Sequence, residues 1–289
     1  MQRELDVASK TERRSTEYLA EFLGEFAGTL ILVLFGCGAV AVTVLFSAHT
    51  GLFQVAAVWG IAAMLAIYST RHISCAHLNP AVSIAMVVAG RMKASKLPVY
   101  LAGQFAGAFL AAALLHALFA SSIAQFEKAH GIVRGAPASK QTAVMFGEYY
   151  PNPGAGDNAS VSTLNAMCAE MAGTYALVFL IFSLCEGCNV GRPDDSLTPL
   201  FIGLSLCMII SMIAPLTQAG FNPARDLSPR LFAYLAGWKQ AAFPDRHWGF
   251  LTVYVFGPIA GGVLAALTFR IVIEPAMHTK SRSANCGCN

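Results

Sequence analysis

Two copies of the tripeptide Asn-Pro-Ala carry the chemistry that this 289-residue sequence predicts. One begins at Asn79 and the other at Asn222, 143 positions later. Asparagine is a preferred helix N-cap and proline is favoured at the first helical position, so each copy predicts the start of a helix. Each asparagine amide can also donate hydrogen bonds to a hydroxyl or water oxygen. The motifs therefore indicate two helix starts, each with an amide that can bind such an oxygen.

Both predicted helices are too short to cross a bilayer. Ten residues separate Pro80 from Arg91, and a helix of that length extends about 15 Å, half of the hydrocarbon core. After Pro223, a short amphipathic run reaches Trp238. Backbone that breaks at membrane depth must be buried or line a water-filled path. Two half-helices that meet near the midplane would place their positive N-terminal ends together there and repel cations.

The spacing of charged residues predicts the long helices that position these motifs. Forty-five uncharged residues separate Glu25 from Arg71, and further uncharged stretches follow along the chain. Because a helix needs about 20 apolar residues to cross the hydrocarbon core, we expect six transmembrane helices. Their predicted ranges are 19–46, 52–72, 97–122, 162–185, 196–214 and 249–272. The expected fold class is an all-α membrane protein.

The two halves of the chain repeat one another. Glu25 begins the sequence Glu-Phe-Ala-Gly-Thr and Glu170 begins Glu-Met-Ala-Gly-Thr, an offset of 145 residues that nearly equals the offset between the Asn-Pro-Ala motifs. Three spans in each half mean that the second half starts from the opposite side of the membrane. We therefore expect inverted repeats, at about 17–123 and 161–275, with two re-entrant half-helices that enter from opposite faces.

The composition disfavours several other classes of protein. Hydrophobic residues make up 56% of the chain and charged residues only 12%, about half the charged share of a soluble protein. A soluble two-domain enzyme, a disordered chain and a disulfide scaffold are therefore disfavoured. A net charge of +3, without a basic stripe interleaved with aromatic residues, gives no indication of nucleic-acid binding. No nucleophile–base set is visible either, so we do not expect an enzyme.

The histidines and cysteines predict no cofactor and no metal site. The seven histidines are scattered, and most of the eight cysteines lie in or near apolar segments, where cysteine acts as a small hydrophobic residue. Cys185 and Cys188 form a C-x-x-C pair, and Cys286 and Cys288 lie in a polar tail. A metal or redox role would need partner ligands, and no histidine lies near either pair in the sequence.

The motifs resemble those of the aquaporin superfamily over nearly the whole chain, and the closest branch is the glycerol facilitators, or aquaglyceroporins. Asp226 is the acidic residue typical of that branch, and Arg230 is its usual basic residue four positions later. The loop sequences that begin at Phe126 and Tyr150 also resemble the bacterial glycerol facilitator. The resemblance implies a passive channel for glycerol, other small uncharged solutes and water, which excludes ions and protons. It further implies a homotetramer in which each monomer is its own pore.

The resemblance also implies roles for individual residues. Asn79 and Asn222 would be the central hydrogen-bond donors of the pore. A constriction toward the outer mouth would be formed by Trp59, Ile210, Ala219 and Arg225. Backbone carbonyls that line the pore would come from the residues before each motif: His77, Leu78, Gly220 and Phe221. The side chain of His77 has a second interpretation, as a hydrogen-bonded interior histidine.

Three acidic residues are expected to support the pore without contacting the solute. Glu25 and Glu170 lie inside apolar segments, where an acid is costly and faces the protein interior. We expect each to accept hydrogen bonds from the broken backbone near a half-helix, because the spans offer too few titratable groups for a proton relay. Asp226 is expected to act behind Arg225.

The expected constriction departs from the glycerol facilitators, which usually pair the tryptophan with Gly and Phe. Ile210 and Ala219 stand at those positions, which is more similar to the plant nodulin-26-like branch, associated with glycerol, water and undissociated metalloid acids. Tyr254, where the facilitators tend to have proline, is a second departure. An apolar wall of Trp59 and Ile210 opposite the donors of Arg225 suits a polyol. Water, urea or metalloid acids remain alternative solutes, and a coupled secondary transporter remains an alternative mechanism.

The distribution of basic residues favours cytoplasmic N- and C-termini. We expect a cytoplasmic segment at 1–16, a channel domain at 17–275 and a cytoplasmic tail at 276–289, in a plasma membrane or a bacterial inner membrane. Arg71 lies near the cytoplasmic approach to Asn79, where it either extends to the interface or narrows the inner vestibule.

Overall fold

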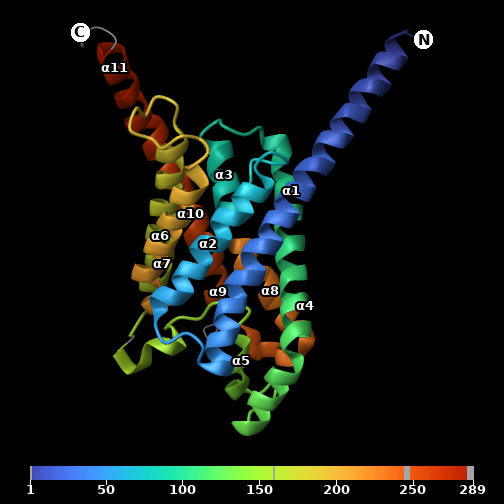
Figure 1. Cartoon of the computed structure of the whole chain (residues 1–289), viewed down its shortest axis with the longest axis vertical. Coiled ribbons are helices and arrows are strands. Elements are labelled where there is room, and N and C mark those ends of the chain that lie inside the picture. Colours follow the sequence, from blue (N-terminus) through green and yellow to red (C-terminus); the bar gives the residue numbers. More distant parts are fainter. Residues whose placement is uncertain (1, 159, 244–247, 285–289) are drawn as a thin grey trace.

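The computed structural model describes residues 2–158, 160–243 and 248–284, which form helices and no strands (Figure 1). Five long helices are α1 (Gln2–Phe46), α2 (Leu52–Thr70), α4 (Leu97–Ala129), α6 (Thr163–Cys185) and α7 (Thr198–Thr217). The sixth is a run of helical pieces: α9 (Gly249–Leu251), η6 (Thr252–Phe256), α10 (Gly257–Thr268), η7 (Phe269–Ile273) and α11 (Glu274–Ala284). The prediction of an all-α membrane protein is confirmed, because six helices are long and apolar enough to cross a bilayer.

The shorter helices connect or interrupt these spans. Two of them, α3 (Pro80–Val88) and α8 (Pro223–Ala233), begin at the prolines of the Asn-Pro-Ala motifs, and η4 (Tyr234–Trp238) continues α8. The remaining pieces are η1 (Ala94–Lys96), η2 (Pro137–Ser139), α5 (Lys140–Ala143), η3 (Pro153–Asn158) and η5 (Lys239–Ala242). Both motif helices are short, as the sequence predicts.

Four of the six spans extend beyond their predicted ranges: α1 begins at Gln2, the sixth run continues to Ala284, and α4 and α7 continue past 122 and 214. Helix α4 continues past 122 to Ala129, because Glu127 near its end has an ion-pair partner in Arg134 and a hydrogen-bond donor in Thr142. Helix α7 continues past 214 and ends where the backbone of Gln218 turns left-handed, with φ of 64°. The Gln218 Oε1 also accepts the N–H of Tyr149 (2.7 Å). Contacts with other segments therefore hold both of these ends, and a count of apolar residues cannot predict such contacts.

The two halves pack as related units and exchange their short helices. Helix α1 packs against α2 and α4 as α6 packs against α7 and α10, while α3 packs against α10 and α8 packs against α4. The pairs α1–α4 and α6–α10 approach closely at glycines. A Cβ at Gly107 would lie 2.3 Å from the Phe26 carbonyl oxygen, and one at Gly261 would lie 2.1 Å from that of Met171. Each short helix is thus held by the third span of the other half.

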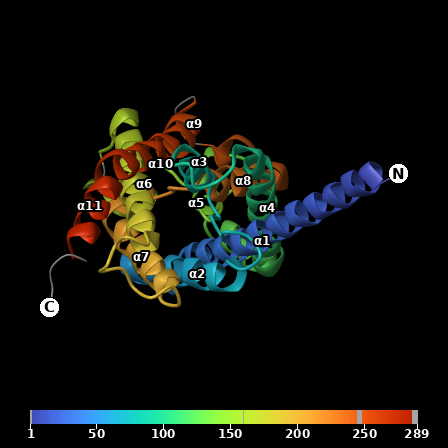
Figure 2. The ribbon, with the colours of Figure 1, turned by 90° about the horizontal axis from the view of Figure 1, so that it is seen from above.

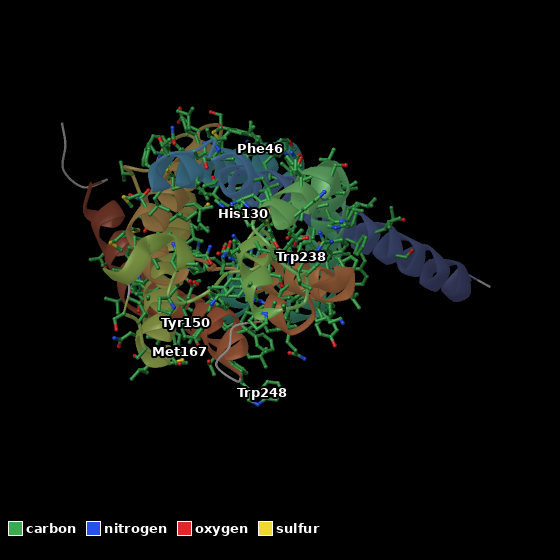
Figure 3. The ribbon with its side chains drawn as sticks, turned by 90° about the horizontal axis from the view of Figure 1, so that it is seen from below. Phe46, His130, Tyr150, Met167, Trp238 and Trp248 are labelled. Atoms are coloured by element: carbon green, nitrogen blue, oxygen red, sulfur yellow. The ribbon has the colours of Figure 1, made fainter. Side chains whose placement is uncertain are left out.

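Both ends of the described chain project from the same end of the bundle, which we call the terminal end (Figures 1 and 2). The first residues of α1 extend well beyond the other helices there. Figure 3 views the opposite end, where the labelled Trp248 points away from the helices. Large apolar side chains cover the outward faces of the spans, and Phe53, Leu118 and Met212 are each more than 60% exposed. Such a surface suits contact with lipid.

Candidate functional site

The N-terminal tips of α3 and α8 meet and bind one another. The Asn79 Oδ1 accepts a hydrogen bond from the N–H of Ala81 (2.8 Å), and the Asn222 Oδ1 accepts one from Ala224 (3.0 Å), so each asparagine caps its own helix. The Asn79 Nδ2 donates to the Phe221 carbonyl (2.9 Å). The Asn222 Nδ2 donates to the Leu78 carbonyl (2.7 Å). These reciprocal bonds fix the two amides beside one another.

The backbone that leads into each tip is strained and is held by a buried carboxylate. Leu78 and Phe221, which precede the two asparagines, both have φ of 54°, a left-handed conformation that costs energy for residues other than glycine. Glu25 accepts the N–H groups of His77 (2.9 Å) and Leu78 (2.7 Å). Glu170 accepts those of Gly220 (2.9 Å) and Phe221 (2.7 Å). Each carboxylate therefore satisfies two N–H groups that the broken helix leaves without a carbonyl partner.

The glycines of the repeated Glu-x-Ala-Gly-Thr motif make room for the same residues. A Cβ at Gly28 would lie 2.4 Å from the Leu78 Cδ2, and a Cβ at Gly173 would lie 2.1 Å from the Phe221 Cε1. The motif thus supplies an acceptor for the broken backbone and a space for the side chain before the asparagine. This double requirement explains why the motif occurs once in each half.

A single cavity of about 390 Å³ passes the two tips. Its lining includes all ten residues predicted for the pore: Trp59, His77, Leu78, Asn79, Ile210, Ala219, Gly220, Phe221, Asn222 and Arg225. Arg71 and Trp59, 12 residues apart on α2 and its C-cap, also line it, so the cavity follows this helix for about 18 Å. Glu25, Glu170 and Asp226 do not line it and lie behind the wall.

Arg225 and Trp59 lie in contact with one another in the cavity wall. The Arg225 Cζ lies 4.2 Å from the Trp59 ring centroid, and both side chains are almost fully buried. Ile210 and Ala219, each 4% exposed, complete this part of the lining. The guanidinium offers fixed N–H donors, while the side chains of Ile210 and Ala219 and the carbon framework of the Trp59 ring are apolar. One end of the cavity therefore combines a donor wall with an apolar wall.

The ion-pair partner of Arg225 is Glu148, which sequence reasoning missed. Glu148 lies in the loop between α5 and α6 and is 3% exposed. Burial raises the pKa of its carboxyl to about 8, although the Arg225 guanidinium opposes this shift. The sequence held one signal: Glu148 is the only charged residue between Lys140 and Asp157. Only the folded loop shows that it reaches the cavity wall.

Asp226 positions that loop and does not pair with Arg225. Its Oδ1 accepts the N–H of Glu148 (2.7 Å) and a bond from the Arg230 guanidinium (2.6 Å). Arg230 also donates to the carbonyls of Glu148 (2.6 Å) and Ala242 (2.5 Å). The acid–base pair typical of glycerol facilitators thus lies behind the constriction and fixes the backbone of Glu148.

Tyr254, the second departure from the glycerol facilitators, supports the broken segment before α8. Its hydroxyl donates to the carbonyl of Thr217 at the end of α7 (3.1 Å). A Cβ on Gly220 would lie 3.0 Å from the Tyr254 Cδ1, so the ring packs closely against this glycine. This buried tyrosine therefore braces the turn that leads to Asn222.

Two residues at the terminal end of the cavity had open interpretations in the sequence. His77 lines the cavity, but its Nδ1 lies 3.2 Å from the Ser83 hydroxyl and its ring packs 4.9 Å from that of Tyr100, as expected of a hydrogen-bonded interior histidine. Arg71 lines the cavity and donates to the Asp195 carbonyl (2.5 Å), so it ties the loop before α7 to α2. Arg71 therefore lies in the cavity wall with its guanidinium bound to the loop before α7.

The C-x-x-C pair has a histidine beside it that the sequence does not reveal. The Sγ of Cys188 lies 3.2 Å from the Nδ1 of His278 on α11. Within the described ranges, no group of three or more His, Cys, Asp or Glu side chains is arranged to hold a metal ion. Cys286 and Cys288 lie outside the described residues.

Six apolar helices around an elongated cavity have the architecture of a membrane channel. The sequence profile of the family "Major intrinsic protein" matches residues 12–269, and the chain belongs to this family. The glycerol uptake facilitator protein of Pseudomonas aeruginosa is 41% identical over 263 residues, which are 91% of each chain. The glycerol uptake facilitator protein of Escherichia coli K12 is 39% identical over 252 residues, 87% of each chain. The aquaglyceroporin structure from Plasmodium falciparum superposes with a TM-score of 0.78 at 26% identity, over 91% of this chain and 99% of that one.

Proposed function

We propose that this protein is a passive channel for glycerol and other small uncharged solutes, that it also passes water, and that it excludes ions and protons. The observation that carries the proposal is the cavity itself. Asn79, Asn222 and Arg225 supply hydrogen-bond donors along one conduit, and apolar side chains supply most of the remaining lining. The names of the related facilitators and the relationship to an aquaglyceroporin support glycerol as the solute.

A polyol fits such a conduit because its two edges differ. Its hydroxyl groups can accept hydrogen bonds from the Arg225 guanidinium and then from the two asparagine amides. Each amide uses one N–H on the other tip, and no described residue accepts its second N–H. The CH groups of the polyol can face Trp59 and Ile210 without leaving a buried polar group unpaired. The solute thus exchanges water contacts for wall contacts stepwise.

Cations, including protons, meet two barriers in the same conduit. Arg225 is a fixed cation at the constriction, and the N-terminal ends of α3 and α8 add about half a positive charge each at the tips. A water molecule that accepts hydrogen bonds from both asparagines has its lone pairs occupied, so it cannot accept a proton from a neighbouring water. Neutral solutes feel neither barrier, which separates passive flux from ion conduction.

The composition of the constriction favours a second group of solutes. Ile210 and Ala219 leave the wall without a bulky aromatic side chain beyond Trp59. Compact neutral acids of metalloids, such as arsenous acid, and urea also present several hydroxyl or amide groups to the donors of Arg225. A channel mainly for water would need more polar lining at Ile210. We therefore place metalloid acids and urea second, after glycerol.

We also propose an arrangement of the chain in the membrane. Helices α3 and α8 re-enter from opposite faces, and the channel domain spans 17–275, with inverted repeats at about 17–123 and 161–275. The segment 1–16 and the tail 276–289 lie in the cytoplasm, on the side of the terminal end. Four copies assemble as a homotetramer in a plasma membrane or a bacterial inner membrane. No cofactor takes part.

Stopped-flow light scattering on proteoliposomes tests the proposed function. We expect fast reswelling with glycerol, with low activation energy and without any ion or pH gradient. Water, urea and arsenous acid complete the panel and rank the solutes. Glycerol flux equal to that of protein-free liposomes would refute the glycerol assignment. Flux that requires an ion gradient would replace the channel by a coupled secondary transporter.

A further inference from the structure

The indole of Trp59 lies directly against the backbone of α1 at Gly36. A Cβ at Gly36 would lie 2.3 Å from both Cε3 and Cζ3 of Trp59 and 2.4 Å from its Cδ2. Ordinary contacts of a Cβ are 3.4 Å or longer. Any side chain at this position would therefore have to displace one of the two groups by about 1 Å. The absence of a side chain at Gly36 therefore allows the indole to pack against α1.

Helix α2 cannot move away to relieve such a clash. Directly after Trp59, a Cβ at Gly60 would lie 2.5 Å from the Gly203 carbonyl oxygen, and a Cβ at Gly203 would lie 2.4 Å from that of Gly60. The backbones of α2 and α7 therefore already touch at the level of Trp59. Packed backbones of this kind yield less readily than a side chain with rotatable bonds. The indole is the part that would shift.

The indole of Trp59 also lies against the guanidinium of Arg225. Arg225 stacks on the Trp59 ring with its Cζ 4.2 Å from the centroid, and its ion pair with Glu148 holds it in place. Trp59 and Arg225 both line the cavity. Because the ring already touches the guanidinium, an indole that leaves α1 moves along Arg225 and into the cavity that both residues line.

We propose that Gly36 is a specificity-determining position. Because it has no side chain, the Trp59 indole packs on the backbone of α1, and this packing sets the width of the constriction. The inference rests on the proposed function, because it assigns the width that admits a polyol. A carbon atom of a polyol needs about 3.5–4.0 Å to each wall atom. A water molecule needs only about 2.8–3.0 Å to its hydrogen-bond partners. A shift of about 1 Å at the indole therefore acts on polyols before it acts on water.

The test compares Gly36→Ala with Gly38→Ala on the same helix. A Cβ at Gly38 meets only the Leu115 Cδ1, at 3.8 Å, which is an ordinary contact. Both variants gain the same helix propensity from alanine, so the comparison isolates the contact with Trp59. In proteoliposomes, Gly36→Ala should lower glycerol permeability about tenfold or more and water permeability less than about threefold. Gly38→Ala should match the unchanged protein for both solutes.

The double variant Gly36→Ala/Trp59→Phe tests the direction of the shift. The smaller ring leaves room for the new methyl group, so glycerol permeability should recover toward that of Trp59→Phe alone. Equal loss of water and glycerol flux in Gly36→Ala, unchanged glycerol flux, or no recovery in the double variant would each overturn the proposal. The first outcome would indicate a damaged helix pair and not a narrowed constriction.

A thermal unfolding cycle of the same variants in detergent gives a readout that is independent of transport. Gly36→Ala should unfold at least about 3 °C below Gly38→Ala, as expected for an overpacked core. Trp59→Phe should remove most of this difference, because the two sites are in contact. Additive changes in the unfolding temperature would contradict a contact between Gly36 and Trp59. If the unchanged protein conducts no solute at all, the proposed function fails. The unfolding cycle still decides whether the Trp59 indole packs on Gly36.

Discussion

The centre of the conduit consists of matching parts from the two halves of the chain, whereas the residues of its constriction are not repeated. At the centre, Asn79 and Asn222 cap helices in the same way and bind the residue before the opposite asparagine. At the third position after each asparagine the halves differ, with Val82 in α3 and Arg225 in α8, and both side chains line the cavity. The repeated parts therefore set the architecture. The single parts give the conduit a polarity and a selective end.

The carboxylates behind the tips should show the largest effect, because they stabilise the repeated centre. Glu170→Ala leaves the buried N–H groups of Gly220 and Phe221 without an acceptor, at about 1–3 kcal/mol for each group. Glu25→Ala should cost a similar amount, since Glu25 makes the matching bonds to His77 and Leu78. Thermal unfolding in detergent measures both losses.

Glu170→Gln is the matched control for this prediction. It retains one carbonyl acceptor and the shape of the side chain, so its loss should be smaller than that of Glu170→Ala. A Glu170→Ala protein as stable as the unchanged one would show that the carboxylate does not hold the broken backbone.

Arg225→Ala should break the asymmetry without destroying the architecture. The substitution removes the fixed cation and widens the constriction, so we expect proton or cation leakage to rise about tenfold, which corresponds to ~1.4 kcal/mol of lost barrier. A pH-sensitive dye inside proteoliposomes measures this leakage. Val82→Ala, at the corresponding position of the first half, is the control and should leave exclusion intact. Equal leakage in the two variants would place the selective barrier elsewhere.

Ile210→His should sharpen the comparison by adding a polar group to the apolar wall. A polyol loses contact for its CH groups while water gains a partner, so the glycerol-to-water permeability ratio should fall about fivefold, or ~1 kcal/mol. Met208→His places the same side chain on the same helix at a position that is 60% exposed and outside the cavity lining. An unchanged ratio in Ile210→His would remove Ile210 from the constriction.

Glu148 should give the smallest effect, through pH. Burial raises the pKa of its carboxyl to about 8, so the group is mostly protonated at about pH 6 and mostly ionised at about pH 9. Only the ionised form pairs with Arg225 and withdraws N–H donors from the solute. Glycerol permeability should therefore fall two- to fivefold over this range, equivalent to about 0.4–1 kcal/mol. Glu148→Gln should be flat over the same range, and an identical slope in both proteins would separate Glu148 from the constriction.

The sequence predicts the parts of this protein that depend on local rules. Uncharged stretches predict the spans, and the Asn-Pro motifs predict the starts of α3 and α8, because caps and apolar lengths are properties of neighbouring residues. The internal repeat adds the relation between the halves. The roles of the ten predicted pore residues came from the family resemblance, and their positions relative to the two motifs identified them in this chain.

The remaining features depend on contacts between distant segments. Glu148 reaches Arg225 only through a folded loop, which Asp226 and Arg230 hold in place. The contact between Gly36 and Trp59 depends on how closely α1 and α2 approach. His278 reaches Cys188 from another helix, 90 residues along the chain. Patterns of neighbouring residues cannot predict these contacts. The sequence therefore identifies the hydrogen-bond donors of the conduit but not the groups that position them.

A structure determined by crystallography or electron microscopy in the presence of glycerol tests the central claim most directly. We expect the Asn79 and Asn222 amides to lie together at the meeting point of α3 and α8, with glycerol in an open conduit between Arg225 and those amides. Asparagines that lie far apart, or tips that are sealed from any continuous path through the protein, would contradict it.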